Sequence, residues 1–532
     1  MPFSISMPVK VSILKIALAI ALVLGSSLPL HAQSPAKSSG ALPSMGDTSE
    51  LPAASERRIG QRIAASIYRD PDYMDDPVLQ DYLLSIWQPL MDAARARGDI
   101  TPELSERFAW ELFLIRDRSV NAFALPGGYL GIHLGLISTV SNRDELAAVL
   151  GHELSHVTQR HISRLISQQD KSAPWMIGAM ILGALAASKN PQVASALMTS
   201  GQAVAVQNQL NFSRDMEREA DRIGLSVMMD AGFDPRGAGS MFEKLQQASR
   251  LNDNGSFGYL RSHPLSIERM AEVQARLQLA PVEKPNTTPA KSDAALQTQT
   301  LHTMMAARAK VLSNPGADVL RALLQEAQRA ASNAANNSNR AGTLYGGILA
   351  AAKLREHTLA QSLMSQLSSV VSGKAGLTRA ASLLQIEIDL LASRVPATAA
   401  SLDINQPKER AELLLQSRAL LAAGRAGDVS GRLSTWVANN PQDSTAWQLL
   451  ATAYGNQNQT VRAIRADAES QVARLDYAAA LDRFKAAQNM LRSNPASGDF
   501  MESSIIDART RQVDLLLREQ AAQDKLDSQL QR

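Results

Sequence analysis

The second half of the chain constrains the fold most strongly, because it carries the pattern of α-helices almost without interruption. Beyond a cluster of prolines at 281–289, Ala, Leu, Gln and Arg dominate, and the apolar residues recur at helical spacing. Aromatic residues make up only 4% of the 532 residues, whereas the strands of sandwiches and barrels are rich in them. The sequence therefore predicts a mainly α-helical protein and argues against an all-β fold.

A faint repeat in this half indicates stacked pairs of helices. Trp447 and Tyr454 follow Pro441 by six and thirteen residues, offsets that fit the tetratricopeptide template of paired helices about 34 residues long. Residues 297–410 are helical without a clean match, so the number of repeats there stays open. We expect a tetratricopeptide-like domain over 297–532 with a concave surface that binds peptide or protein. The alternative is an Ala-rich bundle without a binding role.

The N-terminus predicts export. Residues 1–32 have the layout of a secretory signal peptide, with a basic start, an apolar run and a short segment that ends at Ala32. Leu30 is larger than the residue preferred at its position, so the exact cleavage site stays open. An uncleaved membrane anchor is the alternative. We expect the mature protein to be soluble outside the cytoplasm.

Composition divides the rest of the chain. Residues 33–55 are rich in Ser, Pro, Gly and Ala without periodicity and predict a flexible N-terminus. The prolines at 281–289 mark a linker that we place at 281–296. Between these segments we expect one domain over 56–280. It contains the only other long apolar run, which is too short to span a bilayer.

Composition also limits the chemistry. The chain has no cysteine, which excludes disulfides, thiolate metal ligands and a cysteine nucleophile. It has 54 Lys and Arg against 51 Asp and Glu, without a basic run. Because a nucleic-acid partner needs a clustered positive face, we expect none. Any metal must be bound by His, Asp or Glu.

The strongest functional signal is an H-E-x-x-H motif, in which Glu153 lies between His152 and His156. Upstream, Asn142 and Glu145 predict a helix N-cap and its capping-box partner, so the motif belongs to a helix. On one helix face the two imidazoles lie about 6 Å apart along the axis and reach a single ion. The motif predicts one Zn²⁺ per chain, with the carboxylate of Glu153 as the general base toward a zinc-bound water.

A catalytic zinc has three protein ligands, so one more must come from elsewhere. Glu217 is the best candidate, because it shares a helix face with Asp221 four residues later. One carboxylate then binds zinc, and the other accepts the free N–H of a ligating imidazole. Glu219 lies about 160° from Asp221 and is the weaker candidate, and His161 lies about 140° off the metal face and is expected to be a packing or surface histidine. Alone, this segment would be interpreted as a solvated helix face.

The motifs together resemble the zinc metallopeptidases related to the CAAX prenyl protease and its bacterial relatives. The resemblance is carried by H-E-x-x-H, by S-R-x-x-E-x-E-A-D-x-x-G some sixty residues later, by the Pro-Gly-Gly turn at 126–128, and by Ser-His-Pro at 262–264 with Arg269. It covers about residues 55–280. The departures lie in the tail, whose repeats do not align clearly.

The resemblance implies roles for particular residues. His152, His156 and Glu217 would be the zinc ligands, Glu153 the general base, and Asp221 an acidic partner that donates a proton. The helix geometry instead favours Asp221 as the group that orients a ligating imidazole. Both interpretations of Asp221 stay open.

With export before it and helical repeats after it, the same resemblance implies a periplasmic endopeptidase of outer-membrane protein quality control. Its clients would be unfolded or stalled outer-membrane proteins, including the barrel that transports lipopolysaccharide. The repeat domain would contact the outer-membrane barrel assembly machinery, which implies association with the outer membrane. One alternative is a chaperone-like client-binding protein whose protease site is normally latent, and another is a membrane-attached protease.

Three further segments carry hypotheses about substrate access. Asn121, Ala122 and Phe123 lie in an apolar run that predicts an edge strand, to which an extended substrate adds by main-chain hydrogen bonds. Residues 171–211, inserted between the two ligand helices, suit a lid over the cleft. His263 either fills the fourth zinc position as a latch, or stabilises the oxyanion, or is a loop histidine fixed by the next proline. We favour the latch.

Overall fold

The computed structural model describes residues 51–168, 214–250, 257–279, 289–332, 338–396, 409–494 and 499–529. The expected signal peptide and the expected lid over 171–211 lie outside these ranges, as does most of the expected flexible N-terminus. In the described part of the chain, no helix is long and apolar enough to cross a membrane. The predicted fold class, mainly α-helical with a small β-element, is confirmed.

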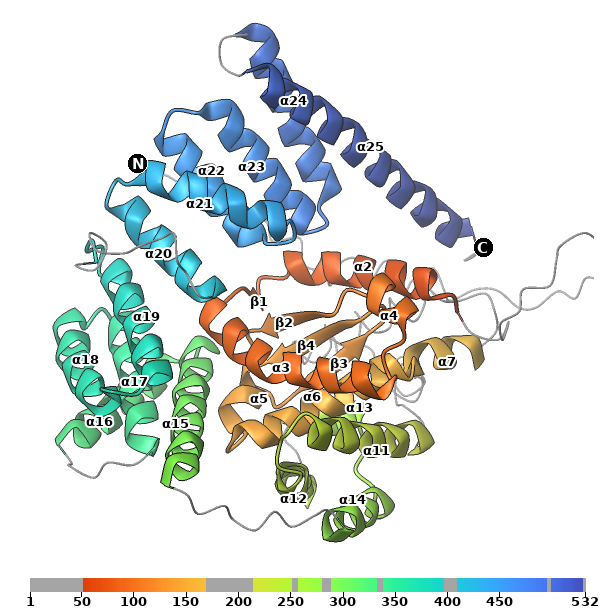
Figure 1. Ribbon diagram of the computed structural model, residues 1–532, viewed down its shortest axis with the longest axis vertical. Helices are drawn as coiled ribbons and strands as arrows, with labels where there is room; N and C mark the ends of the chain where they lie inside the picture. Colours follow the sequence, from red (N-terminus) through yellow and green to blue (C-terminus); the bar gives the residue numbers. More distant parts are fainter. Residues whose placement is uncertain are drawn as a thin grey trace, which may run out of the picture.

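A four-stranded sheet lies at the centre of the first domain (Figure 1). In spatial order its strands are β1 (Tyr73–Met74), β2 (Glu111–Ile115), β4 (Tyr129–His133) and β3 (Ala122–Leu125). Strands β2 and β4 are parallel, and β3 is antiparallel to β4, with Ala122 opposite Ile132. Strand β3 therefore forms one edge of the sheet, at the place where the sequence predicts an edge strand.

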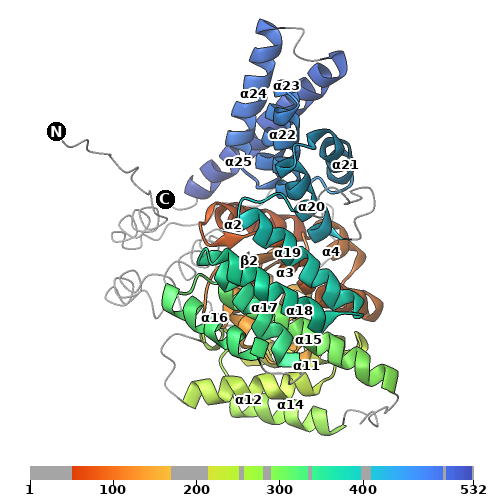
Figure 2. The ribbon, with the colours of Figure 1, turned by 90° about the vertical axis from the view of Figure 1, so that its left-hand side faces the viewer.

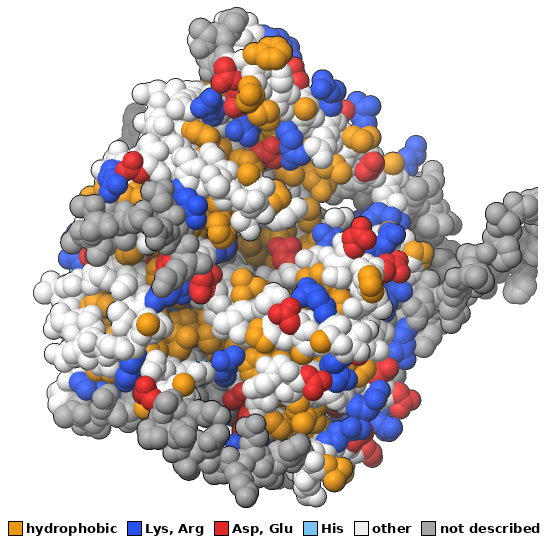
Figure 3. All heavy atoms as spheres, in the orientation of Figure 1, with side chains coloured by type: hydrophobic (Ala, Val, Ile, Leu, Met, Phe, Trp, Pro, Cys, Tyr) orange, Lys and Arg blue, Asp and Glu red, His pale blue; other side chains and the backbone are white. Residues whose placement is uncertain are grey.

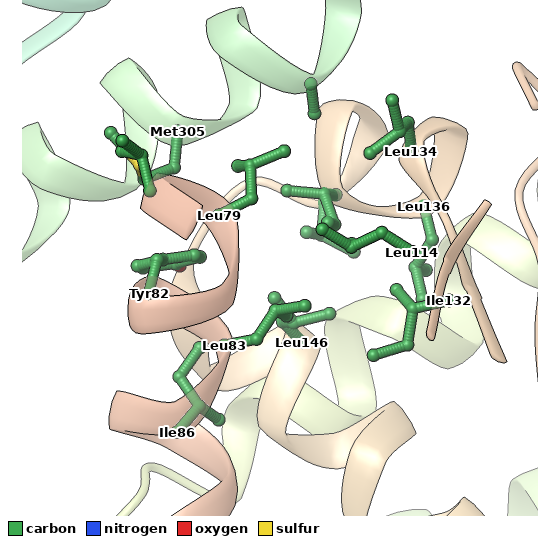
Figure 4. Packing of buried hydrophobic residues seen from close by; sticks show 14 of the residues in the cluster. Leu79, Tyr82, Leu83, Ile86, Leu114, Ile132, Leu134, Leu136, Leu146 and Met305 are labelled. Atoms are coloured by element: carbon green, nitrogen blue, oxygen red, sulfur yellow. The ribbon is translucent and has the colours of Figure 1, made fainter. Parts of the chain in front are cut away.

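Helices cover both faces of this sheet. The described helices of the first domain are α2 (Ala53–Arg69), α3 (Pro77–Arg97), α4 (Pro102–Arg107), α5 (Leu134–Thr139), α6 (Arg143–Thr158), α7 (His161–Gln168), α11 (Arg214–Asp230), α12 (Arg236–Arg250), α13 (Tyr259–Ser262) and α14 (Ile267–Leu279). Because successive strand residues point to opposite faces, Phe113 packs with α2 while Leu114 packs with α3. Figure 4 shows Leu114 and Ile132 facing Leu83 and Leu146 in the second layer.

Local sequence sets the ends of helix α3. The side chain of Asp76 accepts a hydrogen bond from the Leu79 N–H, and Pro77 occupies the first turn, where its missing N–H costs nothing. Gly98 ends the helix in a left-handed conformation with φ 82°. Helix α2 begins at Ala53, so the last residues of the expected flexible segment are helical.

The tail consists of helices in every range that the structure describes. They are α15 (Pro289–Leu312), α16 (Ala317–Ser332), α17 (Ser338–Lys353), α18 (His357–Val371), α19 (Ala375–Leu391), α20 (Arg410–Ala422), α21 (Ala426–Asn439), α22 (Ser444–Asn456), α23 (Thr460–Ala473), α24 (Tyr477–Ser493) and α25 (Phe500–Gln529). Helix α15 begins inside the expected linker 281–296, because Pro289 suits the first turn and Ala and Gln favour a helix. From α16 onward, each helix of the tail packs against the next one, and α15 packs against α17.

The tail packs against the first domain, so the two are not connected by the linker alone. Figures 1 and 2 show α15 to α19 beside it and α20 to α25 beyond α2. Met305 of α15 packs with Leu79 and Tyr82 of α3 (Figure 4), and one hydrophobic cluster continues from the sheet into α19. On the face shown in Figure 3, basic and acidic side chains are interspersed. The expected linker 281–296 therefore separates two stretches of sequence whose described residues contribute to one hydrophobic core.

Candidate metal centre

Helix α6 positions the H-E-x-x-H motif, and its start is fixed as predicted. The Asn142 side chain accepts a hydrogen bond from the Glu145 N–H at 2.9 Å. The Glu145 carboxylate reaches back to the Ser141 N–H at 2.7 Å and also accepts from Lys244 at 2.6 Å. The first turn of α6 is thereby tied to α12, which holds the helix in place beneath the sheet.

Two glycines bring the second ligand helix, α11, against α6. A Cβ atom built on Gly224 would lie 2.9 Å from backbone atoms of Gly151 and His152, which is closer than real Cβ contacts. Because neither glycine has a side chain, the two backbones meet at this point. The close crossing brings Glu217 and Asp221 of α11 to the histidines of α6.

Four buried side chains meet at this crossing. His152, His156, Glu217 and His263 each offer one donor atom, and these atoms lie within 4.8 Å of one another. His152 Nε2 lies 2.9 Å from His156 Nε2 and 3.3 Å from His263 Nδ1. Glu217 Oε1 lies 3.4 Å from His156 Nε2 and 2.9 Å from His263 Nδ1. Since neighbouring donors of a tetrahedral zinc site lie about 3.3 Å apart, the spacing and the donor types fit one zinc ion.

Glu153 lies beside this cluster without joining it. The side chain is fully buried, and neither carboxylate oxygen has a hydrogen-bond partner among the described residues. Its Oε1 atom lies 3.4 Å from His263 Nε2. A buried carboxylate without hydrogen bonds is costly, so this geometry suits a group that meets water or substrate.

Asp221 contacts a ligating histidine, as the helix geometry suggests. Its Oδ1 atom lies 2.9 Å from His152 Nδ1, on the side of the ring away from the cluster. Arg269 donates to both oxygens of Asp221, at 2.6 and 2.8 Å, and its Nη1 lies 2.7 Å from Glu217 Oε2. Burial raises the pKa of Asp221, but hydrogen bonds from Arg269 and His152 outweigh it, so the pKa lies below its ordinary value. Arg269 thus joins the carboxylates of Glu217 and Asp221.

His161 makes a contact that the sequence analysis missed. Helix α6 ends at Thr158, and Arg160 adopts φ 53°, so the chain turns back instead of continuing the helix. His161 is fully buried, with its Nδ1 atom 2.9 Å from His156 Nδ1 and its Nε2 atom 3.2 Å from Glu219 Oε2. It is therefore a packing histidine, as expected, but it packs against a ligand. A helix that continued unbroken past Thr158 would place His161 off the metal face, and the turn at Arg160 brings it back to His156.

The segment that carries His263 is docked on the edge strand. The Tyr259 N–H donates to the Val120 carbonyl at 3.1 Å, and the Tyr259 ring stacks on His263 with centroids 4.5 Å apart. The side-chain oxygen of Asn121, directly before β3, is buried and has no hydrogen-bond partner in the described structure. Within β3, Ala122 is buried and Phe123 half-buried. The predicted substrate strand and His263 are therefore neighbours.

Comparisons with known proteins agree with this geometry. Residues 82–277 match the model of peptidase family M48, within the region of the sequence resemblance. The chain is 29% identical over 475 residues to the beta-barrel assembly-enhancing protease of Escherichia coli, which covers 87% of this chain and 89% of that protein. It is 28% identical over 398 residues to the protease of the same name from Yersinia pestis, covering 74% and 76%. It is also 33% identical over 175 residues to the mitochondrial metalloendopeptidase OMA1 of Schizosaccharomyces pombe, covering 33% and 49%.

Proposed function

We propose that this chain is an exported zinc endopeptidase of the M48 type that degrades misfolded or stalled outer-membrane proteins and assists their assembly. The observation that carries the proposal is the cluster of four buried donors, with the buried Glu153 carboxylate beside it that accepts no hydrogen bond from the described residues. The matches to the beta-barrel assembly-enhancing proteases support the client class, because the Escherichia coli match covers 87% of this chain and so extends beyond the peptidase domain into the helical tail.

His152, His156 and Glu217 hold the zinc ion, with the donor atoms already at matching distances. When bound, zinc acts as a Lewis acid that polarises a peptide carbonyl and acidifies water. Glu153 takes the proton of the attacking water and passes it to the leaving amine, since no hydrogen bond from the described residues occupies its oxygens. Asp221 fixes the ring of His152 by accepting its Nδ1–H. We assign Asp221 to orientation because Arg269 already holds both of its oxygens.

Strand β3 supplies the surface for an extended substrate. As an edge strand it offers main-chain groups over 121–123, and pairing through the main chain depends little on side chains. That mode suits unfolded clients of varied sequence. The helical tail then recruits clients or the barrel assembly machinery, and the pattern of a signal peptide at 1–32 supports a periplasmic location.

The second candidate is a chaperone-like protein whose protease site is normally latent. One observation favours it: His263 Nδ1 stands with the other three donors, where it takes the position that a catalytic zinc leaves open. We propose that His263 acts as a latch. The two candidates differ in whether hydrolysis by Glu153 is needed for the function.

A cleavage assay tests the proposed function. The zinc-loaded mature protein is mixed with a urea-unfolded outer-membrane β-barrel protein, and fragments are followed by mass spectrometry. We expect cleavage by the wild type, by the His263→Ala variant or by both, and a loss of about a hundredfold or more in Glu153→Gln with its zinc retained. Glu103→Gln, an exposed carboxylate on α4, is the matched control and should cleave normally. Unchanged cleavage by Glu153→Gln would overturn the assigned base, and no cleavage by any zinc-loaded form would favour the chaperone.

A further inference from the structure

The contacts behind His156 point to two further residues of the metal centre. We infer that His161 and Glu219 position His156 for zinc, through hydrogen bonds that run from the ligand to a carboxylate on α11. The inference rests on the proposed zinc site. It concerns residues outside the H-E-x-x-H motif, and it gives the two ligating histidines different hydrogen-bond partners.

Zinc binding through Nε2 determines which ring nitrogen of His156 carries the hydrogen. Its Nε2 atom faces the donor cluster, 2.9 Å from His152 Nε2, and its Nδ1 atom faces His161. A neutral imidazole that binds a metal through Nε2 carries its hydrogen on Nδ1. His156 Nδ1 therefore donates, and the only ring atom that can accept at 2.9 Å in this pair is the Nδ1 of His161.

The hydrogen bond from His156 in turn determines which ring nitrogen of His161 carries the hydrogen. Since its Nδ1 atom accepts, a neutral His161 carries its hydrogen on Nε2 and donates to Glu219 Oε2 at 3.2 Å. Glu219 is itself held by the Nη1 of Arg164 at 2.8 Å. Hydrogen bonds thus pass from α6 through α7 to α11 in one direction, and they end on the Glu219 carboxylate, which forms an ion pair with Arg164.

Burial explains why this arrangement is fixed. His156 is 1% exposed and His161 is 0% exposed. Solvent therefore does not compete for their ring nitrogens. His152 receives the same support directly from Asp221 at 2.9 Å, without an intervening ring. Metal-ligating histidines need such a partner to set the ring orientation and to raise the basicity of the ligating nitrogen. His161 and Glu219 supply it for the second histidine.

Zinc affinity tests the inference without relying on peptidase activity. We would measure the zinc dissociation constant of the full mature chain by competition with a chelator. His161→Leu removes the acceptor and should weaken zinc binding about 10- to 100-fold. His161→Asn keeps an oxygen acceptor near the position of Nδ1 and should recover part of that loss. Glu219→Gln keeps the shape of the side chain without its charge. Its zinc affinity should lie between those of His161→Asn and the wild type.

A control separates positioning from packing. His302→Gln alters another buried histidine, which bonds to Tyr82 and to the Val140 carbonyl away from the cluster. It should lower the stability of the apo-protein and leave zinc affinity unchanged.

In Co²⁺-loaded protein, the Nδ1–H signal of His156 should be protected from exchange in the wild type and should exchange rapidly in His161→Leu.

The outcomes are distinct. If His161→Leu lowers the stability of the apo-protein but binds zinc as tightly as the wild type, His161 only packs and the inference is overturned. Equal zinc affinity in His161→Leu and His161→Asn, both weakened, would remove the role of the accepting atom. A wild-type chain that binds no zinc would instead refute the proposed function.

Discussion

At the scale of single residues, His263, the proposed latch, would decide whether the centre is silent or active. It is buried, it lies 2.9 Å from Glu217 and 3.4 Å from Glu153, and Tyr259 stacks on its ring. In this position the imidazole would compete with water for a bound zinc ion. Moved away from the metal, the same side chain would be a hydrogen-bond donor for the developing oxyanion.

The His263→Ala variant separates these two roles. If His263 is a latch, the variant should cleave an unfolded client faster than the wild type and should degrade itself, because the fourth position is then free for water. If it stabilises the oxyanion, the rate should fall by about a hundredfold with zinc retained. Cleavage rates and zinc content are measured on the same samples. Unchanged values for both would leave His263 as a loop histidine fixed by Pro264.

At the scale of elements, the crossing of α6 and α11 holds the site together. The Gly224→Ala variant places a methyl group 2.9 Å from the backbone of Gly151 and His152, so the helices must separate. We expect a loss of about 1–3 kcal/mol in the free energy of unfolding, together with weaker zinc binding as Glu217 moves away from the histidines. Urea titration and chelator competition measure the two effects.

Gly455 provides the matched control for this variant. It lies exposed in α22, and a Cβ atom there would meet nothing within 4 Å. Gly455→Ala should therefore stabilise the protein by about 0.5–1 kcal/mol, with no change in zinc affinity. If Gly224→Ala behaves in the same way, the close crossing does not position the ligands.

The elements also show why some of the site follows from sequence and some does not. The cap at Asn142, the common face of His152 and His156, and the pairing of Glu217 with Asp221 depend on residues three or four apart, and sequence patterns record such spacings. The turn at Arg160 that brings His161 back is a break in a periodic pattern, which the pattern itself does not reveal. The docking of Tyr259 on Val120 joins segments far apart in sequence, so only the folded chain reveals it.

At the scale of the whole molecule, three arginines of the tail join it to the start of α3. Arg308 pairs with Asp76, Arg379 with Asp81, and Arg410 with Asp75. Both side chains of the Arg308 pair are buried, and Arg308 also reaches Glu387 at 2.7 Å. These contacts fall within residues that composition alone assigned to separate domains, because charge pairing between distant segments leaves no periodic trace in sequence.

Breaking the buried pair should therefore destabilise the whole chain. Arg308→Met leaves the Asp76 carboxylate buried without its partner, at a cost of about 3–5 kcal/mol in the free energy of unfolding. Urea titration, monitored by circular dichroism, measures this loss in the free energy of unfolding. Arg321→Met, which removes an exposed pair with Asp318 on α16, is the control and should leave stability unchanged within error. Equal stability of both variants would show that the tail does not depend on this contact.

The central claim is that His152, His156, Glu217 and His263 surround one zinc ion, and X-ray absorption at the zinc edge tests it most directly. In the wild-type chain carrying one zinc, we expect four nitrogen and oxygen donors at about 2.0–2.1 Å, with the scattering pattern of three imidazoles. Failure to retain stoichiometric zinc, or a six-coordinate shell of oxygen donors without imidazole scattering, would contradict the account.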